Sequence, residues 1–62
     1  MNDFIINVGQ TREELRPFES AANVRDAFER AEELTAEYKC IEVVYMPEDD
    51  DDINEVVWTW YN

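Results

Sequence analysis

The chain has 62 residues, an ordinary apolar fraction of 45%, and two Trp, three Tyr and three Phe, a composition that argues against disorder. Its sixteen acidic residues oppose five basic ones, and the formal net charge of −11 disfavours direct binding to nucleic acid or to an anionic membrane, since phosphate contacts need clustered Lys and Arg. A chain this short predicts one small domain over residues 1–62, which buries only about 60% of the surface of its unfolded form.

The N-terminal third predicts one strand and a connector. Apolar side chains alternate over residues 3–8, which places Phe4, Ile6 and Val8 on one face of a strand. Residues 10–19 are expected to form a connector. A short strand around residues 15–18 is an alternative, and Pro17 would confine it to the edge of a sheet.

The middle of the chain predicts a single amphipathic helix. Ser20 is the expected N-cap, and the helix is expected to run to about Tyr38. Apolar residues recur at three- and four-residue steps, the spacing of one buried stripe. That stripe comprises Val24, Ala27, Phe28, Ala31, Leu34 and Tyr38.

The last third predicts a β-hairpin. Residues 40–46 and 53–61 hold most of the β-branched and aromatic residues, and an acidic connector separates them. Alternation assigns Ile41, Val43 and Tyr45 of the first run to the core. It assigns Val56, Trp58 and Trp60 of the second run to the same core, because Glu42 and Glu55 then point away from it.

These elements predict an α+β fold of the order β-α-β-β, with a three-stranded, mainly antiparallel sheet and one helix packed on one face. A single helix leaves the other face of the sheet uncovered. The apolar residues expected there are typical of an interface. A homodimer through this face is therefore one hypothesis, with Val44, Met46, Val57 and Tyr61 as its contact residues.

Two groups of acidic residues form the second candidate surface. The connector carries Glu48, Asp49, Asp50, Asp51 and Asp52, and the helix carries Asp26, Glu29, Glu32, Glu33 and Glu37. Five carboxylates over the ~16.5 Å from Asp26 to Glu37 give one negative charge per ~3.3 Å, similar to the ~3.4 Å of one DNA strand. Acidic helices also occur as merely solvated faces, so both interpretations stay open.

The sequence lacks the residues that several kinds of functional site require. Counted from Asp50, a calcium loop would need glycine at Glu55 and a bidentate acid at Tyr61, so we expect no metal site. The absence of histidine and of a Gly-rich phosphate loop predicts a protein that is not an enzyme and needs no cofactor. Cys40 is the only cysteine, which favours a reducing compartment, and no apolar run could span a membrane; we expect a cytoplasmic protein.

The strand, acidic helix and hairpin resemble the small acidic inhibitors that phages encode against host proteins, such as anti-CRISPR proteins and other DNA mimics. The resemblance lies in architecture and charge, carried by the helical stretch 25–34 and by Glu48 to Asp52. It implies that the acidic groups bind a basic host protein, one that normally binds nucleic acid. The expected function is inhibition by occupying a cationic channel, and a structural module that homodimerises is the alternative.

Overall fold

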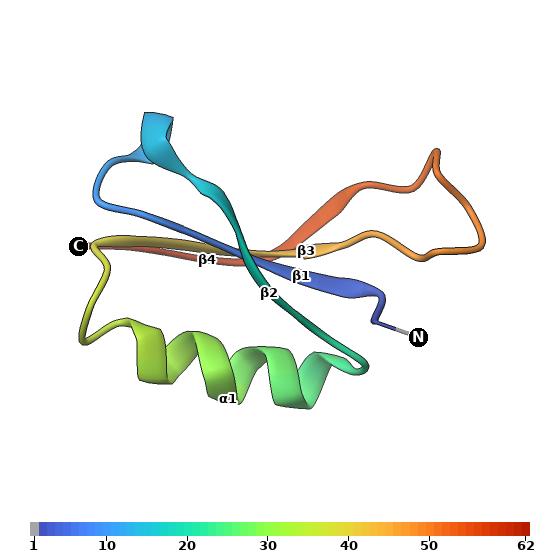
Figure 1. Ribbon diagram of the computed structural model, residues 1–62, viewed down its shortest axis with the longest axis horizontal. Helices are drawn as coiled ribbons and strands as arrows, with labels where there is room; N and C mark the ends of the chain where they lie inside the picture. Colours follow the sequence, from blue (N-terminus) through green and yellow to red (C-terminus); the bar gives the residue numbers. More distant parts are fainter. Residues whose placement is uncertain (1) are drawn as a thin grey trace.

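A computed structural model describes residues 2–62. Within them the protein forms one antiparallel sheet with a helix on one face (Figure 1). The strands lie in the order β2-β1-β3-β4. The elements are β1 (Phe4–Gly9), the 3₁₀ turn η1 (Arg12–Glu14), β2 (Arg16–Ala21), α1 (Val24–Leu34), β3 (Cys40–Tyr45) and β4 (Glu55–Tyr61). The predicted α+β class, single helix and hairpin are confirmed. The predicted strand count was wrong, because the sheet has four strands.

The additional strand is β2, which the alternative prediction of a short edge strand at residues 15–18 anticipated only in part. Its residues are mostly polar, and Phe18 is its one large apolar residue, so no alternation marks it as a strand. It pairs only with β1, and Pro17, which lacks an N–H, lies at this outer edge as expected. Phe18 is the unpaired residue of a bulge, and its ring packs 5.7 Å from that of Tyr38.

The helix is shorter than predicted at both ends. Asn23 is the N-cap, and its side-chain oxygen accepts a hydrogen bond from the backbone N–H of Asp26 at 2.9 Å. The predicted cap, Ser20, lies instead in β2. The helix ends at Leu34, and a turn then brings Tyr38 back against the core. The predicted extension to Tyr38 was therefore wrong.

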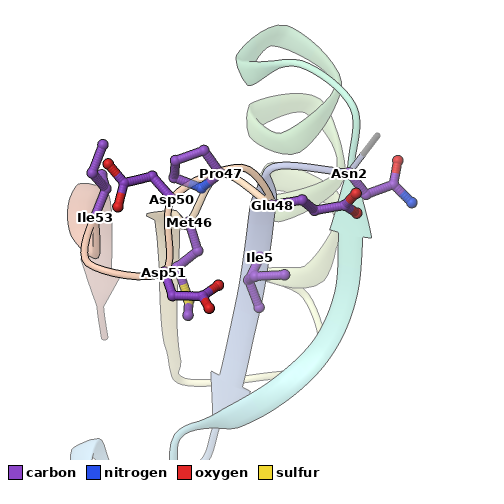
Figure 2. Close-up of a pocket in the computed structure, with 8 residues that line it drawn as sticks. All are labelled: Asn2, Ile5, Met46, Pro47, Glu48, Asp50, Asp51 and Ile53. Carbon is purple, nitrogen blue, oxygen red and sulfur yellow. The ribbon is translucent and has the colours of Figure 1, made fainter.

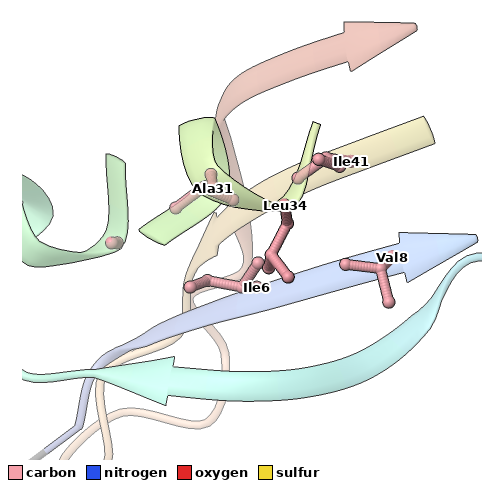
Figure 3. Close-up of a cluster of buried hydrophobic side chains, with 7 residues drawn as sticks. Ile6, Val8, Ala31, Leu34 and Ile41 are labelled. Atoms are coloured by element: carbon pink, nitrogen blue, oxygen red, sulfur yellow. The ribbon is translucent and has the colours of Figure 1, made fainter. Parts of the chain in front are cut away.

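The core lies between α1 and the inner face of the sheet (Figure 3). Small side chains at Ala27 and Ala31 allow the helix to lie close to the strands, and Leu34 fills the space between them. Val24, expected in this stripe, is exposed at the start of the helix. The buried cluster is Ile6, Val8, Ala27, Ala31, Leu34, Ile41 and Val43.

A bulge in the β3–β4 hairpin changes which face Val56 occupies. Trp58 pairs with Val43, but Val56 pairs with Val44, so Val57 has no partner in the register. One extra residue reverses the alternation beyond it. The assignment of Val56 to the core was wrong for this reason: it lies on the face that α1 does not cover, which we call the open face, and is half exposed.

Candidate functional site

The helix acids lie on the surface that faces away from the sheet. Ala27, Ala31 and Leu34 face the strands, and the helical period then places Glu29 and Glu32 on the opposite side. The acidic side chains of the helix are all exposed. Glu37, counted among the acidic line in the sequence, belongs to the turn after the helix, so the line along α1 contains only Asp26, Glu29, Glu32 and Glu33.

Two arginines offset much of the charge on the helix. Arg25 pairs with Glu29 at 3.5 Å, and Arg30 pairs with Glu33 at 3.5 Å. Four acids and two arginines leave a net charge of −2 from Arg25 to Glu33, a stretch of about 12 Å. The resulting density, roughly one net charge per 6 Å, is lower than that of a DNA strand. The helix is thus a weaker phosphate analogue than its acids alone indicate.

Arg30 also joins the helix to the edge strand β2. Its Nε donates to both carboxylate oxygens of Glu19, at 2.9 and 3.1 Å, and its terminal nitrogen lies 2.8 Å from the same carboxylate. The hydrogen bond to Glu19 raises the pKa of Arg30, desolvation opposes the rise, and the charges of Glu19, Glu33 and Glu37 add to it. This geometry gives Arg30 an internal structural role.

The acidic tip of the β3–β4 hairpin, Glu48 to Asp52, has a different electrostatic environment. Its five residues are all exposed, and no ion pair reaches them within residues 2–62. Backbone hydrogen bonds form two successive turns, from Asp50 N–H to Pro47 O at 3.3 Å and from Ile53 N–H to Asp50 O at 3.2 Å. The Asp50 carboxylate also accepts the N–H of Asp52 at 3.0 Å. The tip therefore holds five carboxylates in an ordered loop.

The structure does not bring the two acidic groups together. In Figure 1 the helix lies along one side of the sheet, and the hairpin extends beyond the sheet and away from the helix. The outer surface of α1 and the acidic tip are therefore two separate anionic surfaces. Of the two, the tip carries more uncompensated charge.

The four residues expected at a dimer face lie in different surroundings. Val44 is 5% exposed and so has little surface to offer. Met46 (41% exposed) follows β3, and Val57 is the extra residue of the bulge. Tyr61 lies at the opposite end of the open face, beside Cys40 in the register. Tyr61 is therefore separated from Met46 by the length of β3.

Tyr61 is engaged by other parts of the chain. Its O–H donates to Glu42 at 2.9 Å, and the Arg12 guanidinium lies 4.6 Å from the ring centre. The hydrogen bond to Glu42 is the main reason that the pKa of Tyr61 is raised; desolvation and the charge of Glu42 add to the rise, and Arg12 opposes it.

Gly9 allows η1 to fold over this end of the open face. A Cβ at Gly9 would lie 2.8 Å from the Glu14 carbonyl carbon and 3.0 Å from the Leu15 nitrogen, both backbone atoms. Figure 1 shows η1 on the side of the sheet opposite the helix. Cys40 lies at this end of the sheet, opposite Gly9 and Tyr61 in the register, and it is buried. The chain itself therefore occupies part of the face that the sequence predicted to be open.

At the other end of the open face, the structure forms a pocket of about 490 Å³ beside the acidic tip (Figure 2). Its apolar lining comes from β1 and from both ends of the hairpin loop. The lining residues are Asn2, Ile5, Met46, Pro47, Glu48, Asp50, Asp51 and Ile53. Sequence reasoning missed this pocket, and its one signal was the presence of Met46, Pro47 and Ile53 on both sides of the acid run.

Both tryptophan side chains pack against the core of the protein itself. Trp58 and Trp60 are half-buried against the core, and the Trp58 ring lies 6.2 Å from that of Phe28.

Within residues 2–62, no three His, Cys, Asp or Glu side chains are placed to hold a metal ion, and no helix is long and apolar enough to cross a membrane. Comparison with protein-family models, curated proteins and solved structures finds no match for this chain.

Proposed function

We propose that this protein is an acidic inhibitor that occupies the cationic channel of a host nucleic-acid-binding protein. The acidic tip is the observation that carries the proposal. It presents five exposed carboxylates in an ordered loop, and no cation pairs with them within residues 2–62. Such a loop offers Lys and Arg side chains on a partner the ligands that phosphates normally provide.

The proposed mechanism is competition. The acidic tip enters the channel first, and the outer acids of α1 supply a second, weaker contact. A net charge of −11 attracts a cationic partner over a distance and speeds association, and salt reduces this attraction. While the inhibitor is bound, nucleic acid is excluded both by its bulk and by its charge.

The likeness to phage inhibitors of the anti-CRISPR and DNA-mimic type supports the same proposal. It suggests a site of action in the cytoplasm of a host cell. No catalysis or cofactor is required, because binding alone blocks the target. The size of the charge also supports a role beyond solubility, for which a magnitude of ~2–8 is enough in a small domain.

The first test is capture from nuclease-treated host lysate, with this protein as bait, at ~50 mM and ~500 mM salt. These concentrations bracket a large change in electrostatic screening. We expect capture of a nucleic-acid-binding protein at the lower concentration and its release at the higher one. The purified target should then lose bound nucleic acid as this protein is added. A captured protein that keeps its nucleic acid would contradict the proposal.

Two matched variants assign the contact to one surface. The first replaces the four aspartates 49–52 with asparagine, and the second replaces Glu29, Glu32, Glu33 and Glu37 with glutamine. Both remove four negative charges, and the second also removes the ion-pair partners Glu29 and Glu33 of Arg25 and Arg30. We expect the first variant to weaken the complex more and to lower its salt dependence more. Equal effects would refute a specific role for the tip, and unchanged binding in both would refute the decoy.

The alternative function, a homodimeric structural module, has less support from the geometry. Exposed Val56, Val57 and Met46 favour it, since large apolar side chains are normally covered. However, Val44 is buried and Tyr61 is engaged by Arg12 and Glu42. Sedimentation at increasing concentration tests it, with Val57→Lys as the variant expected to stay monomeric.

A further inference from the structure

The pocket beside the acidic tip combines an apolar floor with an anionic rim. Ile5 on β1, Met46 after β3 and Ile53 before β4 converge there from distant parts of the sequence. Met46 and Ile53 are 41% and 37% exposed, so both offer apolar surface to a ligand in this pocket. In Figure 2 the Asp51 side chain extends toward Met46 and Ile5, and Glu48 lies on the side nearer Asn2.

The shape of the pocket is held by the backbone. The N–H of Met46 donates to the carbonyl oxygen of Asp3 at 2.7 Å, and the N–H of Glu48 donates to the Asp3 carboxylate at 3.2 Å. These bonds tie the start of the hairpin loop to the start of β1. The two turns of the tip hold the other side. The pocket is therefore largely formed before any ligand arrives, and binding needs little ordering of the loop.

We propose that this pocket receives one apolar side chain of a partner protein, flanked in sequence by Lys or Arg. The apolar side chain would lie on Ile5, Met46 and Ile53, and the flanking cations would reach Glu48, Asp50 and Asp51. The inference rests on the proposed function and deepens it, because it specifies which cationic surface the inhibitor recognises. A volume of about 490 Å³ is within the range of small-ligand pockets, so the pocket has room for an apolar side chain and for parts of its neighbours.

Charge complementarity selects this occupant over the others. A second copy of the chain would bring two acidic tips together, and no cation pairs with either tip within residues 2–62 to offset their repulsion. A lipid headgroup or a nucleic acid would place phosphates against Glu48 and Asp51. A neutral apolar ligand would leave the acidic rim without a role. A basic segment with an apolar anchor satisfies both the floor and the rim.

The test uses two synthetic peptides, acetyl-Gly-Lys-Lys-Leu-Lys-Lys-Gly-amide and its counterpart with alanine in place of leucine. Both have the same charge. Binding to the isotopically labelled full chain is followed by NMR at ~0.1 M salt, where charges more than ~10 Å apart are largely screened. We expect the leucine peptide to bind at least about tenfold more tightly, equivalent to about 1.4 kcal/mol. It should also shift the methyl signals of Ile5, Met46 and Ile53.

Matched variants separate the floor from the rim. Ile53→Ser should remove the preference for leucine, whereas Val24→Ser, at an apolar side chain of similar exposure on the helix, should keep it. Asp51→Asn should weaken both peptides, and Glu32→Gln should change neither as much. Circular dichroism checks that each variant is folded, and Met46→Gln, which also changes the floor, replaces Ile53→Ser if that variant does not fold.

The outcomes are distinct from those of the capture experiment. Equal affinity for the two peptides, or signal changes confined to the helix, would overturn the pocket assignment even if a cationic target is captured. Binding that Val24→Ser and Ile53→Ser weaken equally would overturn it as well. A concentration-dependent dimer with the same methyl shifts would identify a second copy as the occupant and refute the proposal. Leucine-selective binding without a nucleic-acid-binding target would uphold the pocket and refute the decoy.

Discussion

Gly9→Ala tests whether η1 closes one end of the open face. The new Cβ would lie 2.8 Å from the Glu14 carbonyl carbon, 2.9 Å from its oxygen and 3.0 Å from the Leu15 nitrogen. All three are backbone atoms, so no side-chain rotation relieves the contact, and the η1 segment has to move away from the sheet. That movement would also displace Arg12 from the Tyr61 ring.

The expected cost follows from two opposing contributions. Overpacking of this kind costs about 1–3 kcal/mol, and the loss of backbone freedom in the unfolded chain returns about 0.4–1 kcal/mol. The difference lies between about 0 and about 2.6 kcal/mol, and its centre of about 1.3 kcal/mol is large for this protein. At about 0.05–0.15 kcal/mol per residue, 62 residues provide only about 3–9 kcal/mol of unfolding free energy in total.

Urea unfolding followed by tryptophan fluorescence measures this difference, since Trp58 and Trp60 lie against the core. We expect Gly9→Ala to lower the midpoint and to change the NMR signals of Tyr61. Ser20→Thr is the control, because it adds one methyl group at an exposed position of β2 and should change stability by less than about 0.5 kcal/mol. A Gly9→Ala protein at least as stable as the wild type would refute the described packing of η1.

Three further predictions concern single side chains. Glu19→Gln should lower the urea midpoint, and the loss should shrink at high salt, because it removes the carboxylate that pairs with Arg30. Tyr61→Phe should remove the tyrosine component that titrates above pH 10 in ultraviolet absorbance, since the hydrogen bond to Glu42 raises the pKa of Tyr61. Leu34→Ala should cost about 2–5 kcal/mol and lower the urea midpoint more than any other variant here, because Leu34 is fully buried.

Each of these has an outcome that contradicts it. Arg25→Gln, at an exposed i,i+4 pair, is the control for Glu19→Gln and should have a smaller effect; the reverse order would contradict the role of the Arg30 contact. For Tyr61, a raised folded-state pKa means that its contribution to stability is complete below pH 10 and is lost as the pH rises through the folded value. Stability that increased over this range would refute the assignment. Cooperative unfolding of Leu34→Ala at the wild-type midpoint would contradict the described core.

Much of the fold is present in local sequence patterns. Alternation at Phe4, Ile6 and Val8 and the helical spacing of Ala27, Ala31 and Leu34 predict the elements that form the core, because each pattern matches the period of one secondary structure. The acid run between two β-rich segments predicts the hairpin and its exposed tip, since five carboxylates without partners are not buried. The class, the single helix and the position of the acidic tip follow from these patterns.

Tertiary contacts decided the remaining features, and they involve residues far apart in the chain. Pairing with β1 makes β2 a strand although its own residues show no alternation, and the extra residue at Val57 moves Val56 to the other face. The pocket brings Ile5 and Ile53 into one lining, an arrangement that depends on strand order and that no local pattern encodes. Local sequence determines the helix and every strand except β2, but the proposed binding surface is set by how those segments pair.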